Sequence, residues 1–298
     1  MQNKIVLGVD IGGSHITAKL VDLESGVTIE GSEIRRLVNS NGTAEEIINN
    51  WCQVIEEAFN SKPVTDRRIG IAMPGPFDYE NGIAWMQNQQ KYDALYGLNV
   101  RDLLAQKLGI LPDAIKFIND AESFLKGEVF SGAAKSCSSA IGFTLGTGFG
   151  SAYYQNGKVE DADLWCSPYK DGIAEDYLST RWFIKRYYEL SGNTIEGVKE
   201  LADLKNDNDA TRVFIDFGRN MAMFLNGLIT QRQPQVIVIG GNISRAFPLF
   251  LDSLVTTLNK GAKEPEIRKA ILGEDASLVG AASCWIITCQ EEKSLLDK

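Results

Sequence analysis

Histidine is almost absent from this 298-residue sequence, which contains only His15. Cysteine is also scarce, and the five residues are Cys52, Cys137, Cys166, Cys284 and Cys289. An odd number at these spacings matches neither a disulfide framework nor a paired CxxC zinc motif. We therefore expect reduced and mostly buried thiols.

Clusters of basic residues and long apolar runs are missing as well. The formal net charge is −9, and no window concentrates enough Lys and Arg to neutralise a run of nucleic-acid phosphates. The longest nearly apolar run, Leu278 to Cys289, is too short to cross a bilayer. The amino terminus passes almost directly into a predicted strand, which leaves no room for a signal peptide. We expect a cytoplasmic protein that binds neither nucleic acid nor membrane.

The remaining composition is that of a soluble globular protein, with 44% hydrophobic and 23% charged residues. A chain of this length exceeds the usual size of one domain, so two domains are expected. The predicted division is a smaller lobe over 1–118, a larger lobe over 119–275, and a carboxyl-terminal helix over 276–298 that packs back on the smaller lobe.

Short β-rich runs and amphipathic helices alternate along both halves of the chain. Thr43 and Glu46 form a capping-box pattern, and apolar residues then recur at helical spacing up to Pro63. A helix is also predicted from Glu175 to Tyr188. The predicted strands cover 5–10, 16–22, 69–73, 115–118, 140–145 and 235–239.

Three of these strands run into glycine-rich bends: DIGGS at 10–14, GTGFG at 146–150 and GGNIS at 240–244. Glycine lets backbone N–H groups approach phosphate oxygens without an intervening Cβ atom. A single bend of this kind is a weak signal, and neither a Rossmann GxGxxG opening a helix nor a Walker GxxxxGK[ST] motif is present. The set therefore indicates another phosphate-binding architecture.

Six motifs in order make the sequence similar to the ROK family of repressors and sugar kinases. They are LGVDIGGSHITAKLVD, IGIAMPGPFD, INDAES, TLGTGFGSA, VIVIGGNIS and LVGAAS. The resemblance implies an α/β protein with the two-lobed, actin-like (ribonuclease H-like) ATPase fold. Family repressors carry a DNA-binding segment before the first phosphate loop, whereas that loop begins here at Asp10. The sequence thus resembles the kinase branch.

The resemblance also assigns roles to individual residues. Asp120 is implied as the base that accepts the proton of a sugar hydroxyl group, Asn119 as a sugar ligand, and Asp10 as a Mg²⁺ ligand, directly or through water. Gly75 and Asn88 fall in segments that line the sugar pocket of the family. The residues implied in ATP binding are Asp10, Gly12, Gly13, Ser14, Gly146, Thr147, Gly148, Gly240 and Gly241.

One segment departs from the family pattern. Most ROK kinases carry a Gly-Glu-x-Gly-His segment followed by a cysteine-rich zinc site, and this chain lacks the ligands for zinc. The stretch DADLWCSPYKDGIAEDYLS resembles the zinc-free segment of polyphosphate glucokinases in the same family. In that alignment Asp163 takes the sugar-binding Glu position, Cys166 takes the His position, and Glu175 keeps the second sugar-binding glutamate. Trp165 either stacks on a sugar or fills the volume of the missing zinc loop.

Together these features predict an ATP- and Mg²⁺-dependent kinase that phosphorylates a hexose, first of all glucose at its 6-hydroxyl group. Polyphosphate as donor is an alternative, prompted by the zinc-free segment. A non-catalytic sugar sensor is a second alternative, prompted by the changed residues at 163 and 166. The resemblance implies a homodimer, and the sequence leaves the identity of the hexose open.

Overall fold

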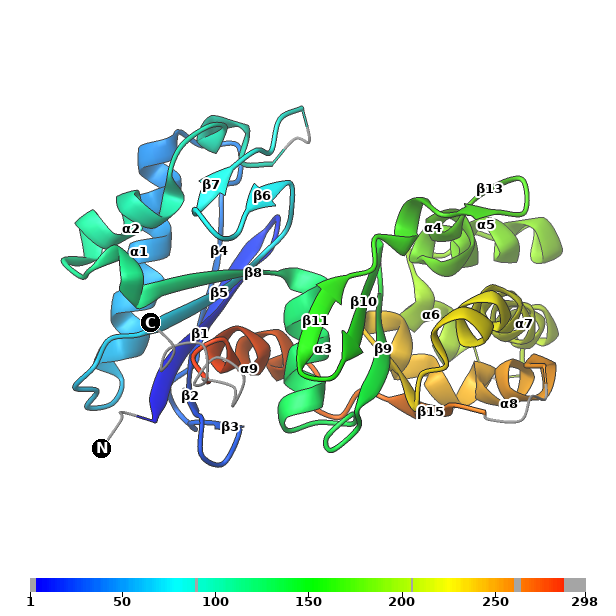
Figure 1. Ribbon diagram of the computed structural model, residues 1–298. Helices are drawn as coiled ribbons and strands as arrows, with labels where there is room; N and C mark the ends of the chain where they lie inside the picture. Colours follow the sequence, from blue (N-terminus) through cyan, green and yellow to red (C-terminus); the bar gives the residue numbers. More distant parts are fainter. Residues whose placement is uncertain (1–3, 89–90, 205, 260–263, 287–298) are drawn as a thin grey trace. The chain divides into compact units, whose positions relative to one another are not determined.

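The computed structural model describes residues 4–88, 91–204, 206–259 and 264–286 (Figure 1). The chain divides into two compact units. Unit 1 comprises Met1–Gly132 and Glu274–Lys298, and unit 2 comprises Ala133–Gly273. Unit 1 extends beyond the predicted boundary at residue 118 because α3 (Asp120–Phe130) packs against α9 (Asp275–Ser283). The end of the predicted terminal helix, 287–298, lies outside the described residues.

Unit 1 is built on a six-stranded sheet with the order β3-β2-β1-β5-β8, in which β4 also pairs with β2. Strand β1 is antiparallel to β2 but parallel to β5, and β5 is parallel to β8. The strands are β1 (Ile5–Ile11), β2 (His15–Asp22), β3 (Val27–Thr28), β4 (Ile34–Leu37), β5 (Ile69–Met73) and β8 (Ile115–Asn119). Between β5 and β8 the chain forms β6 (Phe77–Asp78), β7 (Ile83–Ala84), α2 (Val100–Leu108) and short 3₁₀ turns at 93–95 and 112–114.

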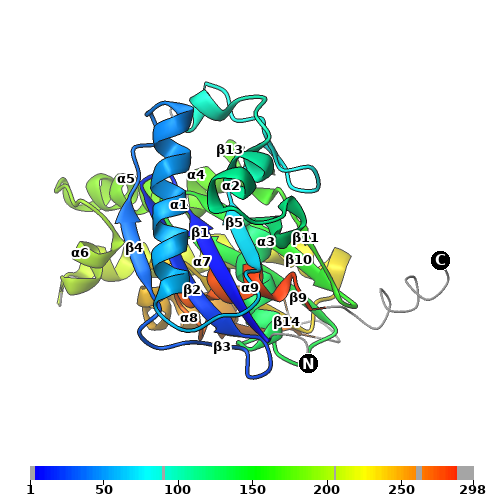
Figure 2. The same ribbon diagram turned by 90° about the vertical axis from the view of Figure 1, so that its left-hand side faces the viewer.

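One face of this sheet carries the main core of unit 1. Alternate residues of β1, including Val9 and Ile11, pack there against α1 (Ala44–Asn60), which Figure 2 shows in front of the sheet. The predicted capping box is confirmed, because Thr43 and Glu46 exchange hydrogen bonds at the start of α1.

The opposite face of the same sheet is covered by α9. A Cβ atom at Gly8 would collide with the backbone of Leu278, so the glycine allows the helix to lie directly on the strand. Ala72 and Ala281 are buried together in the same contact. Since side chains alternate along β1, Asp10 shares this face with Gly8. The sheet therefore carries Asp10 on the α9 side, away from the main core.

Unit 2 repeats this topology in the order β11-β10-β9-β14-β15, again with antiparallel pairings on one side of the first strand and two parallel pairings on the other. The strands are β9 (Ser139–Leu145), β10 (Phe149–Gln155), β11 (Lys158–Asp161), β14 (Val236–Gly240) and β15 (Glu266–Lys269), and a separate hairpin joins β12 (Pro168–Tyr169) to β13 (Gly172–Ile173). The helices are α4 (Ala174–Leu178), α5 (Thr180–Ser191), α6 (Val198–Asp203), α7 (Asn208–Arg232) and α8 (Phe247–Thr257), with 3₁₀ turns at 164–166 and 242–246.

Aromatic side chains fill the core of unit 2. Phe183, Phe217 and Phe250 are buried in contact with one another, and they join α5, α7 and α8. The single helix predicted from Glu175 to Tyr188 is wrong, because Ser179 adopts an extended conformation and separates α4 from α5. Within the described ranges, no helix is long and apolar enough to cross a membrane.

Candidate active site

Two acidic residues stand at the carboxyl edge of the parallel strands of unit 1. Asp10 lies near the end of β1, and Asp120 follows the last residue of β8. Asp10 is partly buried, and its carboxylate accepts no hydrogen bond from the described residues. Burial raises the pKa of Asp10 to about 7, the negative charge of Asp120 adds to the rise, and Arg35 opposes it. The two predicted carboxylates are thus electrostatically coupled.

Asn119 holds the first turn of α3 in place. Its Oδ1 atom accepts hydrogen bonds from the N–H groups of Ala121 and Glu122, at 2.8 and 3.2 Å. Its Nδ2 atom donates to the hydroxyl oxygen of Tyr79 at 3.2 Å. Asp120, next in sequence, is exposed, and its Oδ1 atom accepts a bond from the N–H group of Ala121. Asn119 therefore acts as a helix cap that fixes the position of Asp120.

The two residues assigned to the sugar pocket by resemblance occupy different settings. Gly75 lies beside Tyr79, where an added Cβ atom would stand 3.4 Å from the tyrosine hydroxyl oxygen. That oxygen also accepts from Asn119, so Gly75, Tyr79 and Asn119 are brought together. Asn88 is exposed with a positive φ of 59°, and among the described residues it forms no hydrogen bond or ion pair with another predicted site residue.

The glycine hairpin of unit 1 is closed by a hydrogen bond from the N–H group of Gly12 to the carbonyl oxygen of His15, at 2.9 Å. The buried hydroxyl group of Tyr92 donates to the carbonyl oxygen of Gly12 at 2.5 Å. Neither Gly12 nor Gly13 has a positive φ, and a Cβ atom would meet nothing closer than 3.6 Å at either position. The fold does not require these glycines, whereas close approach of a phosphate group to the backbone would.

The glycine hairpin of unit 2 is also fixed by a residue outside the hairpin. The N–H group of Gly146 donates to the carbonyl oxygen of Gly148, and Thr180 donates to the carbonyl oxygen of Gly146 from both its backbone and its side chain. A Cβ atom at Gly146 would have open space around it. Gly241 differs, because its φ is 78° and a Cβ atom would lie 2.6 Å from the backbone nitrogen of Leu145. Gly146 thus fits a ligand role, and Gly241 is required by the fold.

Glu175 joins this hairpin to α5. One oxygen of its carboxylate accepts the N–H group of Phe149 at 3.1 Å, and the other lies 2.5 Å from a guanidinium nitrogen of Arg181. Glu175, a predicted sugar ligand, therefore also fixes the backbone of Phe149, which follows Gly148. Asp163 makes a different contact, because its carboxylate accepts a hydrogen bond from the indole N–H group of Trp165 at 2.6 Å. The Trp165 side chain is 46% exposed.

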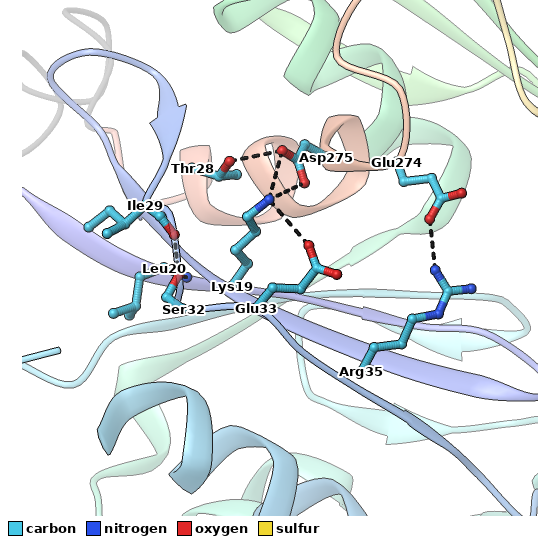
Figure 3. A network of polar contacts seen from close by, with 9 residues as sticks. All are labelled: Lys19, Leu20, Thr28, Ile29, Ser32, Glu33, Arg35, Glu274 and Asp275. Atoms are coloured by element: carbon cyan, nitrogen blue, oxygen red, sulfur yellow. Dashed lines mark hydrogen bonds and ion pairs between the residues drawn. The ribbon is translucent and has the colours of Figure 1, made fainter. Parts of the chain in front are cut away.

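Sequence reasoning missed Arg35, which stands close to Asp10 through strand register. Asp10 pairs with Thr17 on β2, and Thr17 pairs with Arg35 on β4, so the three side chains share one face of the sheet. Figure 3 shows Arg35 bound to Glu274 just before α9, at 2.7 Å. No local motif marks this residue, because its nearness to Asp10 depends on two strand pairings.

A second part of the same network fixes the start of α9. The ammonium group of Lys19 lies 3.0 Å from both carboxylate oxygens of Asp275 and 3.3 Å from Glu33 (Figure 3). The hydroxyl group of Thr28 donates to Asp275 at 2.8 Å. The contacts of Asp275 hold the helix against β2 and β3, and they keep Glu274 beside Arg35.

Asp10 is the residue that fits a magnesium ion. Mg²⁺ prefers oxygen ligands and is usually bound by one or two carboxylates, substrate phosphates and water. A partly buried carboxylate without a hydrogen-bond donor meets that requirement, because a cation would offset the cost of its burial. Within the described part of the chain, no group of three or more His, Cys, Asp or Glu side chains is placed to hold a metal by itself.

Comparisons with known proteins agree with this arrangement. The chain is 26% identical to the N-acetyl-D-glucosamine kinase of Haemophilus influenzae, with 94% of this chain and 98% of the relative covered. It is 27% identical to the glucokinase of Thermotoga maritima, with 93% and 96% covered. A crystal structure of a ROK family glucokinase from Streptomyces griseus, in complex with glucose and AMPPNP, superposes with a TM-score of 0.73 at 23% identity, over 94% of this chain and 98% of that one.

These likenesses confirm the predicted actin-like ATPase fold of the ROK kinases. The model of the ROK family matches residues 6–287, which is nearly the whole chain. Because that match spans well over half of the sequence, the chain belongs to the ROK family.

Proposed function

We propose that this sugar kinase transfers the γ-phosphoryl group of Mg-ATP to the 6-hydroxyl group of a hexose, with Asp120 as the general base. The observation that carries the proposal is the pair Asp10 and Asp120 at one edge of the unit 1 sheet, next to a glycine hairpin whose open backbone the fold does not need. An exposed carboxylate at a helix start, fixed by a buried cap, suits proton transfer.

The proposed reaction divides the work among named groups. Asp120 takes the proton of the sugar hydroxyl group while the oxygen of that hydroxyl group forms a bond to the γ-phosphorus atom. The bond between the γ-phosphorus atom and the oxygen that bridges it to the β-phosphate breaks, which releases ADP. The N–H groups of the Gly12–Gly13 and Gly146–Gly148 hairpins bind phosphate oxygens. A magnesium ion held by Asp10 would neutralise phosphate charge.

The sugar is proposed to be glucose or N-acetylglucosamine. The relatives named above are kinases of these two sugars, and the related crystal structure holds glucose with an ATP analogue. Asn119 keeps one N–H of its amide for a sugar hydroxyl group, since the rest of the amide is engaged in capping α3 and in the bond to Tyr79. We propose Gly75, Asn88, Asp163 and Glu175 as further sugar contacts.

One coupled assay tests the proposal. Glucose, N-acetylglucosamine, mannose, fructose and allose are each offered with Mg-ATP and, separately, with polyphosphate, and phosphorylated sugar is measured directly. We expect turnover with ATP and one of the first two sugars. Sugar-dependent thermal stabilisation without any phosphorylation would favour the sensor alternative, and turnover with polyphosphate alone would favour the other donor.

The Asp120→Asn variant tests the base. We expect kcat to fall by about 10³-fold, within the range for removal of a general base, while sugar binding by calorimetry stays within about twofold. Asp102→Asn is the matched control, because Asp102 is also an exposed acid in the first turn of a helix. Near-normal turnover in Asp120→Asn would remove this residue from the mechanism.

A further inference from the structure

Unit 2 contains a cavity of about 700 Å³ between the β12–β13 hairpin, α4, α5 and α7. None of the residues proposed above to bind ATP or sugar lines it. Nine of its fourteen lining residues are charged. Five cationic side chains contribute to the lining: Lys170, Arg181, Lys185, Arg186 and Arg219. Four acidic side chains do so as well: Asp171, Asp176, Glu189 and Asp216.

The acidic groups of this cavity already have donors. Asp216 lies 2.7 Å from Arg186 and 3.6 Å from Arg219, and Asp171 accepts a hydrogen bond from the hydroxyl group of Tyr177. Asp176 accepts from a backbone N–H group, and Glu189 lies 3.3 Å from Arg186. The carboxylates are therefore largely engaged with partners from the protein.

Lys170 and Lys185, in contrast, form no close ion pair in the described part of the chain, although Asp171 acts on both electrostatically and Asp216 acts on Lys170. Lys185 makes no hydrogen bond or ion pair with any residue that the structure describes. Lys170 donates to the neutral Oδ1 atom of Asn220 at 2.5 Å and lies over the ring of Tyr177. Asn220 is only 6% exposed, and its NH₂ group finds no acceptor among the described residues. A ligand with several oxygen acceptors would satisfy these groups together.

We propose that this cavity binds a phosphate monoester, through Lys170, Lys185 and the NH₂ group of Asn220. A phosphate group offers three acceptor oxygens and close to two negative charges at neutral pH, which matches two ammonium groups and an amide. Burial lowers the pKa of Lys170, and a bound dianion would favour its charged form. The volume is large enough for a hexose phosphate as well as for inorganic phosphate.

Arg181 connects the cavity to the glycine hairpin. It lines the cavity and also lies 2.5 Å from Glu175, whose other oxygen accepts the N–H group of Phe149. The guanidinium side chain is 58% exposed and can turn toward an anion in the cavity. That movement would release Glu175 and loosen the hairpin, so that occupancy of the cavity slows phosphoryl transfer. This regulatory step rests on the proposed function, whereas binding to the cavity does not.

Binding is tested on the unliganded full-length protein at constant ionic strength. Inorganic phosphate, glucose 6-phosphate and glucose are titrated by calorimetry and by tryptophan fluorescence, with Trp182 in the cavity wall as an internal reporter. We expect saturable binding of at least one of the phosphates and not of glucose through this site. Glucose 6-phosphate alone would identify a hexose phosphate as the ligand, and equal binding of both would identify the phosphate group.

Two variants locate the site. Lys185→Ala removes an exposed side chain that makes no hydrogen bond or close ion pair with a described residue, so the variant should fold normally yet weaken phosphate binding at least tenfold. Lys199→Ala, on α6 and outside the cavity, is the matched control and should bind normally. Equal affinity in both variants, or no binding by the parent protein, would overturn the proposal.

Kinetics then test the regulatory step. With the parent enzyme, the phosphate ligand should lower kcat in a way that saturating sugar and ATP do not relieve. In Lys185→Ala the inhibition that substrates do not relieve should disappear, while competitive product inhibition at the active site remains. Inhibition fully relieved by substrate in the parent enzyme would refute the link through Arg181, and an inactive parent enzyme would refute the proposed function without affecting the binding result.

Discussion

The two units have the same sheet topology but differ in where they carry charge. In each, a first strand runs into a glycine hairpin, and two further strands continue the sheet in parallel. In unit 1, Asp10 belongs to the second-to-last residue pair before the turn of the β1–β2 hairpin. Thr144 occupies the equivalent position in the β9–β10 hairpin of unit 2. The last parallel strand ends at Asn119 and is followed by Asp120 in unit 1, whereas in unit 2 it ends at Lys269 and is followed by Ala270.

This difference indicates a division of labour within a repeated fold. In the proposed mechanism, unit 1 combines a backbone that binds phosphate with one carboxylate for metal binding and one for proton transfer. Unit 2 keeps the hairpin without acidic residues at the equivalent strand positions, and it fixes that hairpin by Thr180 and Glu175. We propose that the common topology positions the hairpins and that the side chains at equivalent positions determine which unit carries the chemistry.

Substitution of the equivalent residues Asp10 and Thr144 should give the largest difference in kcat between the two units. We expect Asp10→Asn to lower kcat by about 10³-fold and to raise the Mg²⁺ concentration needed for half-maximal rate, because an amide is a poorer ligand than a carboxylate. Thr144→Ala should change kcat by less than about threefold. Steady-state rates over a Mg²⁺ titration measure both. Similar losses in the two variants would contradict the division of labour.

The elements of both units could be predicted from sequence because their signals are local. Strand alternation, glycine bends and the Thr43–Glu46 capping box all act within a few residues. The break at Ser179 could not be predicted, because Thr180 bonds to Gly146, which is distant in sequence. The nearness of Arg35 to Asp10 likewise depends on the register of three strands. Long-range pairing is the information that a single sequence lacks.

Within unit 2, Gly241 should be needed for stability and Gly146 for ATP binding. Gly241→Ala should lower the free energy of unfolding by about 3 kcal/mol or more, because its φ of 78° and ψ of −179° suit glycine alone and its Cβ atom would meet the Leu145 backbone. Gly146→Ala should leave stability within about 1 kcal/mol and instead raise the KM for ATP. Denaturant unfolding and ATP kinetics distinguish the two. A fold that tolerates Gly241→Ala would remove the distinction.

The raised pKa of Asp10 predicts a smaller effect on stability that depends on pH. The folded-state pKa of about 7 exceeds the ordinary value of 3.8, so the favourable contribution of the protonated group is complete at low pH and is lost as pH rises through 7. Asp10→Asn cannot ionise. Without nucleotide or Mg²⁺, it should therefore be more stable than the parent by about 2 kcal/mol at pH 8, and the difference should vanish near pH 4.

Thr144→Ala is the control for this comparison, since it alters the equivalent position without removing a charge. Its stability difference from the parent should be the same at pH 4 and pH 8. Denaturant unfolding curves at both pH values provide the measurement. A pH-independent difference for Asp10→Asn would show that the carboxylate is not perturbed in the folded protein.

The smallest expected effect is a shift in the pH dependence of kcat/KM for ATP, in opposite directions for Arg35→Gln and Glu274→Gln. Arg35 lowers the pKa of Asp10 and Glu274 raises it, so Arg35→Gln should move the acid limb of kcat/KM for ATP to higher pH, and Glu274→Gln should move it to lower pH. Both side chains are substantially exposed, at 46% and 68%, so solvent limits each shift to a few tenths of a pH unit. The shifts should shrink in 0.5 M salt. Shifts of the same sign would mean that the Arg35–Glu274 pair affects the rate through packing of α9, and not through the charge it places near Asp10.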